Sequence, residues 1–116
     1  MPDGKVFPEG RGAVLVILRF SRYRFKEETV EEGLRILGGH AKAVAAAPGC
    51  EAAWVARGRH PDTVVILLAR FRDDASLRTF EGRLRSDPAL GSDAFALMRL
   101  TTAPPEMAEY EVQAET

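Results

Sequence analysis

The feature that most constrains the fold is a pair of short runs that are mainly apolar at both their odd-numbered and their even-numbered positions. Residues 13–20 read AVLVILRF, and residues 63–71 read TVVILLARF. Short segments rich in β-branched residues favour strands over helices. Because the side chains of a strand alternate between the two faces of a sheet, both faces beside these strands need cover. The chain is therefore expected to form a sheet that is buried on two sides.

The length and composition bound the size and class of the protein. A chain of 116 residues is sufficient for one domain and too short for two. Its hydrophobic content of 46% supports a core rather than disorder. With 16 basic and 17 acidic residues, the chain has no overall field that would attract nucleic acid or an anionic membrane.

Compartment and membrane signals are weak throughout the sequence. No apolar run approaches the roughly 20 residues that a bilayer span requires, and the N-terminus does not read as a signal peptide. The single cysteine, Cys50, cannot form an intramolecular disulfide. We therefore expect a cytoplasmic protein with neither a membrane nor a nucleic acid as its partner.

The domain boundaries follow from composition. Residues 1–12 carry three glycines and two prolines without periodicity, which predicts a flexible arm. We expect one domain over residues 13–113 and a short tail over residues 114–116.

Two helices are predicted by apolar spacing. Residues 29–47 carry an apolar stripe at intervals of four and three, and Pro48 and Gly49 end this helix. The second helix is capped by Asp73 or Asp74, runs to about Arg85 and ends at the Asp87–Pro88 pair. The stripe residues are Val30, Leu34, Leu37, Ala41 and Val44 in the first helix, and Leu77, Phe80 and Leu84 in the second.

Further strands are predicted on either side of the second helix. Residues 50–57 and 63–71 form a hairpin, and residues 107–113 form an edge strand. Residues 95–100 fit a short helix or a strand. The resulting order β-α-β-β-α-β is the ferredoxin-like α+β plan, in which two helices cover one face of an antiparallel four-stranded sheet. Since the other face must also be covered, we expect a homodimer.

These elements resemble those of the antibiotic biosynthesis monooxygenase (ABM) family of the dimeric α+β barrel superfamily. The likeness rests on AVLVILRF, PGCEAAWVAR, VVILLARFRDDASLRTF and the closing AEYEV. It implies that two chains pair as a dimeric α+β barrel, with a ligand pocket between sheet and helices in each. Some relatives oxygenate aromatic polyketide hydroquinones there without a cofactor, and others bind and degrade haem.

The sequence departs from the family pattern at several positions. Where members commonly carry a tryptophan, this chain has Phe71, and where haem-degrading members carry a histidine it has Phe80 and Glu81. The chain contains no asparagine, although those relatives use one on the first strand. The haem-degrading set of residues is thus absent in its known form.

Four residues are candidates for a ligand site. His40 is a candidate base, because its ordinary pKa lies near neutrality, or else a partly buried or flanking histidine satisfied by water or backbone. Trp54 and Phe71 are candidate walls for an aromatic ligand, although core or dimer packing of Trp54 is the commoner role. Arg22 is a candidate for stabilising a phenolate, with a solvated strand-end arginine paired to helix carboxylates as the alternative.

The sequence contains few residues that could support a metal site, a nucleotide site or a catalytic nucleophile. His40 and His60 have no neighbouring ligands at metal-binding spacing, and there is no nucleotide-binding or nucleophile-elbow motif, so neither a metal nor a cofactor is expected. The paired glycines Gly38 and Gly39 indicate either close approach of a ligand or partner, or a break in the helix.

Three functions remain open at this stage. The first is an ABM-like homodimer that binds a small aromatic molecule, with cofactor-independent oxygenation of a phenolic or polyketide-type substrate as its activity. The second is a non-catalytic ligand-binding or oligomerisation module of the same fold. The third, nucleic-acid binding through the RFSRYRFK segment of residues 19–26, is opposed by the glutamates that follow it.

Overall fold

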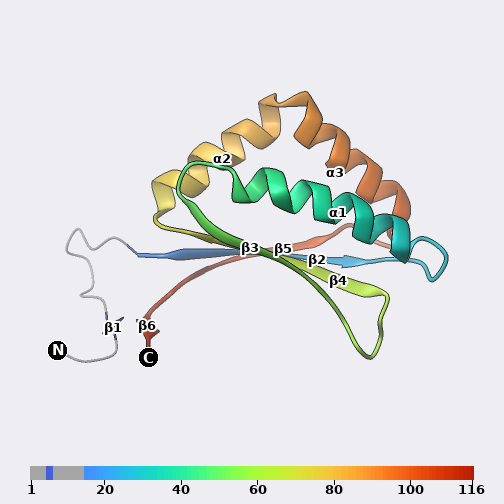
Figure 1. The fold of residues 1–116 in the computed structure, drawn as a ribbon, viewed down its shortest axis with the longest axis horizontal. Coiled ribbons are helices and arrows are strands. Elements are labelled where there is room, and N and C mark those ends of the chain that lie inside the picture. The colour runs from blue at the N-terminus through green and yellow to red at the C-terminus, as the bar shows by residue number, and fades with distance from the viewer. Residues whose placement is uncertain (1–4, 7–14) are drawn as a thin grey trace.

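A four-stranded antiparallel sheet with three helices on one face forms the body of the protein (Figure 1). The structure, a computed structural model, describes residues 5–6 and 15–116. The strand order in this sheet is β3-β4-β2-β5. The elements are β2 (Ile17–Arg24), α1 (Val30–Ala45), β3 (Cys50–Arg57), β4 (Val64–Phe71), α2 (Asp74–Ser86), α3 (Pro88–Leu100) and β5 (Glu106–Glu111). The predicted ferredoxin-like α+β fold is confirmed.

The first strand of the sheet lies further along the chain than the sequence predicts. Residues 13–20 were expected to form it, whereas β2 spans Ile17–Arg24 and residues 13–14 lie outside the described residues. The strand continues through the charged segment because Tyr23 is buried on one face while Arg24 is exposed on the other. This alternation of polar and apolar side chains is itself a strand pattern.

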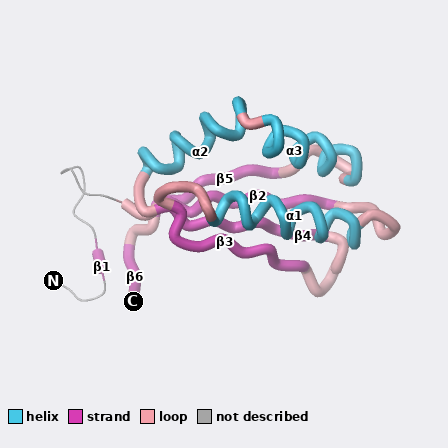
Figure 2. Tube along the Cα trace, turned by 45° about the horizontal axis from the view of Figure 1, so that its top comes forward, coloured by secondary structure: helices cyan, strands magenta, loops and turns pink. Residues whose placement is uncertain are grey.

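A third helix corrects the prediction of two. Asp87 was expected to end the second helix, but its side chain also accepts a hydrogen bond from Ala89 N at 2.9 Å and caps α3. Pro88 occupies the first position of α3, where the missing N–H costs nothing. The ambiguous residues 95–100 therefore belong to a helix, and α3 packs against α1 and α2 (Figure 2).

The core lies between the helices and one face of the sheet. Odd-numbered positions of β2 and β4 point toward the helices and are largely buried. Phe71 at the end of β4 packs against Phe80 of α2, with ring centroids 5.5 Å apart. The largest fully buried apolar side chains are Phe71, Phe80, Leu37, Leu67, Leu77, Leu97, Val44 and Val65.

The opposite face of the sheet, which we call the open face, is also largely apolar. It is built by the even-numbered positions of β2 and β4 and by the positions of β3 and β5 paired with them. Its large apolar side chains are Leu18, Phe20, Trp54, Ile66, Leu68 and Tyr110. Of the helices in the described ranges, none covers this face (Figure 1).

Both ends of the described chain meet in a small second sheet. Strand β1 (Lys5–Val6) pairs antiparallel with β6 (Ala114–Glu115), so the expected tail contributes a strand. Residues 1–4 and 7–12 of the expected arm lie outside the described residues. Among the helices that the structure describes, none has the length and apolar character of a membrane span.

Candidate functional site

A buried histidine between two helices is the first element of the candidate site. Helix α1 places His40 between Leu37 and Val44 on its buried side, because residues three and four apart share one helix face. His40 is only 5% exposed. Its Nδ1 lies 3.3 Å from Oδ2 of Asp93 on α3.

The surroundings of His40 prepare it to accept a proton. Burial lowers the pKa of His40 below its ordinary value of 6.5, the charge of Arg19 lowers it further, and Asp93 partly opposes both. At neutral pH the ring is therefore uncharged. Because an ionised carboxylate only accepts hydrogen bonds, Nδ1 carries the proton that faces Asp93, and Nε2 keeps a free lone pair. This is the arrangement of a general base oriented by a carboxylate.

Strand β2 adds a row of polar side chains on the same side of the sheet. Arg19, Ser21 and Tyr23 alternate along the helix-facing side. Burial raises the pKa of the Tyr23 phenol, which the adjacent Ser21 hydroxyl and Arg19 partly offset. Although the Ser21 hydroxyl lowers the pKa of Tyr23, no well-aligned hydrogen bond joins the two hydroxyls. Ser21 Oγ is therefore buried without a well-aligned partner among the described residues.

A hollow of about 480 Å³ lies beside Arg19, between α2 and β5. Its lining residues are Arg19, Glu81, Met107, Ala108 and Glu109. The Arg19 guanidinium lies over the Phe80 ring, 5.6 Å from its centroid. An apolar wall beside a cation and a polar rim is a combination typical of ligand pockets.

The rim of this hollow is held by Arg78 of α2. Its Nη1 donates to Glu81 at 2.6 Å, and its Nη2 donates to Glu109 of β5 at 2.5 Å. These contacts lower the pKa of Glu109, chiefly through the hydrogen bond from Arg78. Arg78 therefore joins helix α2 to the edge strand across the hollow.

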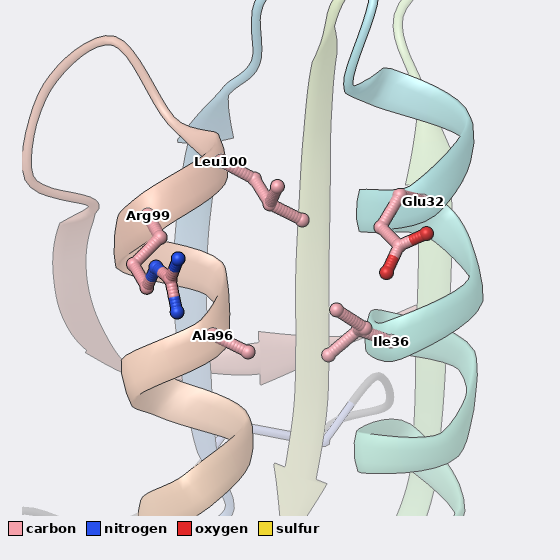
Figure 3. A pocket seen from close by; sticks show the side chains of 5 residues that line it. All are labelled: Glu32, Ile36, Ala96, Arg99 and Leu100. Carbon is pink, nitrogen blue, oxygen red and sulfur yellow. The ribbon is translucent and has the colours of Figure 1, made fainter.

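A second opening, of about 300 Å³, lies in the seam between α1 and α3. Figure 3 shows Glu32 and Ile36 of α1 facing Ala96 and Leu100 of α3 across the seam, with Arg99 lying along α3 beside them. His40 lies one helical turn beyond Ile36 along α1. The His40–Asp93 pair therefore lies about one turn beyond the lining of this opening and is not part of it.

The four residues chosen from the sequence do not come together in one chain. His40 and Phe71 lie on the helix side of the sheet, and Phe71 is fully buried in the core. Trp54 and Arg22 lie on the open face, where Trp54 is 48% exposed. Arg22 lies 3.4 Å from Glu106 of β5, so its carboxylate partner comes from a strand and not from a helix as the alternative role supposed.

The site also contains residues that the sequence reasoning missed. Asp93 comes from the unpredicted third helix, and Arg19 and Ser21 come from the segment of residues 19–26, whose alternation was interpreted as a possible nucleic-acid-binding pattern and not as a continuation of the strand. The alternation of side chains at every second position from Arg19 to Phe25 was the signal that could have predicted this part of the strand. Of the His, Cys, Asp and Glu side chains in the described ranges, no group of three is placed to hold a metal ion.

Comparison with solved structures places this geometry in a known fold. No protein-family model and no curated protein matches the sequence. A variant of SnoaB, a cofactor-independent oxygenase from Streptomyces nogalater, superposes with a TM-score of 0.70 at 20% identity, covering 84% of this chain and 93% of that one. A provisionally assigned antibiotic biosynthesis monooxygenase from Nitrosomonas europaea gives 0.74 at 8% identity, covering 85% and 91%. The chain has the antibiotic biosynthesis monooxygenase fold.

The ABM fold also occurs in proteins that carry no activity in their names. A conserved protein from Methanosarcina mazei Go1 gives a TM-score of 0.73 at 20% identity, covering 84% of this chain and 92% of that one. Because one fold hosts several functions, the function of this ABM-fold chain has to be argued from its own side chains.

Proposed function

We propose that this chain works as a cytoplasmic homodimer that binds a small aromatic molecule between its helices and sheet, and that it oxygenates a phenolic substrate without a cofactor. The observation that carries the proposal is the buried His40 held by Asp93, whose pKa is lowered so that the ring is neutral and ready to accept a proton. The openings beside Arg19 and in the α1–α3 seam lie on the helix side of the sheet, as His40 does, which supports a ligand on this side.

The proposed reaction begins with proton transfer. His40 takes a proton from the methylene carbon of an anthrone-type phenol, and the resulting carbanion, which is delocalised onto the ring oxygen opposite, reacts with dioxygen at that carbon. The hydroperoxide that forms loses water and leaves a carbonyl group. One oxygen atom enters the product, the other leaves in water with two hydrogen atoms of the substrate, and the substrate itself supplies the electrons.

Each candidate residue has a place in this proposal. Phe71 supports the pocket from below by packing on Phe80, the ring beneath Arg19. Trp54 and Arg22 belong to the open face, so in a dimer they meet the partner chain rather than the ligand bound in their own chain. Arg19 takes the phenolate-stabilising role that the sequence suggested for Arg22, because it lies on the side of the sheet that holds His40.

The test is oxygen uptake with an anthrone as substrate, followed by mass spectrometry of the product. We expect the His40→Gln variant to lose roughly a hundredfold or more in kcat while its circular dichroism and Tm stay close to wild type. His60→Gln is the matched control, since His60 is exposed in the β3–β4 turn. Full turnover by His40→Gln, or uptake that needs an added metal or flavin, would contradict the proposal.

A non-catalytic binding module is the second candidate. The observation in its favour is the open face, whose apolar side chains serve packing whether or not the helix side is an enzyme site. Native mass spectrometry separates the two candidates when combined with the uptake assay. A dimer that retains an aromatic compound and consumes no oxygen with any anthrone would favour the module.

A further inference from the structure

Arg19 is a mostly buried cation with a poor partner. Its side chain is 14% exposed, and the ion pair that the described residues offer it is a long one, 3.9 Å to Glu81. The ring of Phe80 beneath it supplies a cation–π contact rather than a hydrogen bond. Burying a charge is costly unless it is paired, so this placement calls for a reason other than packing.

The carboxylates near Arg19 are occupied by another arginine. Glu109 lies directly opposite Arg19 in the β2–β5 register, yet its oxygens accept hydrogen bonds from Arg78 at 2.5 and 3.3 Å. Glu81 accepts from the same guanidinium at 2.6 Å. Arg19 lines the hollow together with Glu81 and Glu109. Because Arg78 pairs with both carboxylates, most of the hydrogen-bonding capacity of Arg19 is left for a ligand.

Ser21 is an independent sign of the same site. Its hydroxyl is fully buried without a well-aligned hydrogen-bond partner among the described residues. It follows Arg19 on the same face of β2 at a strand spacing of roughly 6.6 Å. Its neighbour on β5 is Met107, which lines the hollow, so the hydroxyl lies buried behind this lining residue. A ligand reaches it when the Met107 side chain, which is 54% exposed, moves aside.

We propose that Arg19 and Ser21 form an oxyanion-recognition subsite in the hollow between α2 and β5. Arg19 pairs with an ionised oxygen on an aromatic ring, and Ser21 donates a hydrogen bond to a second oxygen on the same ligand. The ring lies against the apolar lining of the hollow, Met107 and Ala108. This inference rests on the proposed function, because the ligand is the aromatic molecule proposed above, and it adds that the ligand is bound as an anion.

The test compares an anionic ring compound with a neutral one of the same shape. Isothermal titration calorimetry with naphthoate and naphthamide is expected to show a clear preference of the wild type for naphthoate. Arg19→Gln should weaken naphthoate binding by about tenfold to a hundredfold and remove the preference, and Ser21→Ala should weaken binding by about threefold to tenfold. Arg83→Gln, an exposed change on α2, is the matched control for lost charge.

The outcomes separate this inference from the proposed function. If folded Arg19→Gln binds naphthoate as wild type does, the subsite is wrong even when oxygen uptake remains dependent on His40. If wild type binds neither compound and consumes no oxygen with an anthrone, both proposals fall. Should Arg19→Gln not fold, Arg19→Lys and Ser21→Ala take its place. Arg19→Lys is expected to keep the preference for naphthoate with weakened binding, and unchanged binding by both variants would overturn the subsite.

Discussion

Buried polar side chains are few, and two of the three in the described ranges lie in the candidate site. The three buried polar residues are Ser21, His40 and Ser76, of which the first two belong to the candidate site. Ser76 is explained by the start of α2, where its backbone N–H donates to Asp73 at 2.8 Å. His40 has one partner and Ser21 has no well-aligned one. Because unsatisfied burial costs free energy, their presence on one side of one sheet indicates a site rather than ordinary packing.

The lowered pKa of His40 makes a prediction about stability and pH. In the unfolded chain His40 has its ordinary pKa, so between that value and the lower folded pKa the unfolded state binds more protons. The free energy of unfolding should therefore fall as the pH drops below about 6.5, until the folded His40 is also protonated. Urea unfolding from pH 7.5 to 5 is the measurement, with His40→Gln expected to show a shallower decrease. An equally steep decrease in both would contradict the shifted pKa.

Two glycines of α1 predict opposite effects of the same substitution. A Cβ at Gly33 would meet the ring of Phe25 at 2.3 Å, whereas a Cβ at Gly38 would meet nothing within 4 Å. We expect Gly33→Ala to destabilise the fold by about 1–3 kcal/mol through overpacking. Gly38→Ala should stabilise it by about 0.5–1 kcal/mol through helix propensity. Urea unfolding of both variants checks the pair, and a destabilised Gly38→Ala would instead favour close approach of a partner or ligand at this glycine.

At the scale of elements, local patterns predicted most of the fold. The strand over residues 50–57 was placed correctly, and the first helix was placed within two residues at each end. The third helix was missed because Asp87 and Pro88 were interpreted only as a stop. An aspartate followed by proline is also a helix start, since the carboxylate caps the new turn and proline fits its first position.

The cap of α2 carries a prediction of its own. Hydrogen bonds from Ser76 lower the pKa of Asp73, so its contribution to stability is present above the ordinary carboxylate range and is lost as the pH falls through the folded pKa. Asp73→Ala should lower the Tm by a few degrees at pH 7 and by less in acid. Asp74→Ala is the control, because Asp74 only pairs with Arg78 on the surface. Thermal melts at both pH values check this, and equal losses in the two variants would argue against the cap.

At the scale of the whole molecule, the candidate site depends on contacts that no local pattern contains. His40 and Asp93 lie 53 positions apart in the chain and meet only because α3 packs beside α1. The need to cover both sheet faces was visible in the sequence, but which aromatic residue lies on which face follows from strand register. Trp54 pairs with Leu68 and therefore shares the open face with it, away from His40.

The open face makes the last prediction, which concerns assembly. Trp54 on β3 and Tyr110 on β5 are 48% and 55% exposed in the single chain, so a charge at either position should be tolerated by an isolated protomer. In a twofold dimer each substitution occurs twice in one interface. Trp54→Glu and Tyr110→Glu should therefore weaken dimerisation by roughly a hundredfold or more, because each buries an unpaired carboxylate.

Sedimentation velocity over a range of protein concentrations measures this effect. Phe95→Glu is the control, since Phe95 is 64% exposed but lies on α3, on the other side of the molecule from the open face. A wild type that stays monomeric at every concentration would contradict the dimer. A dimer abolished by Phe95→Glu and kept by Trp54→Glu would move the interface to the helices. In that case the apolar open face would still need cover, and a larger assembly or a different partner chain would have to supply it.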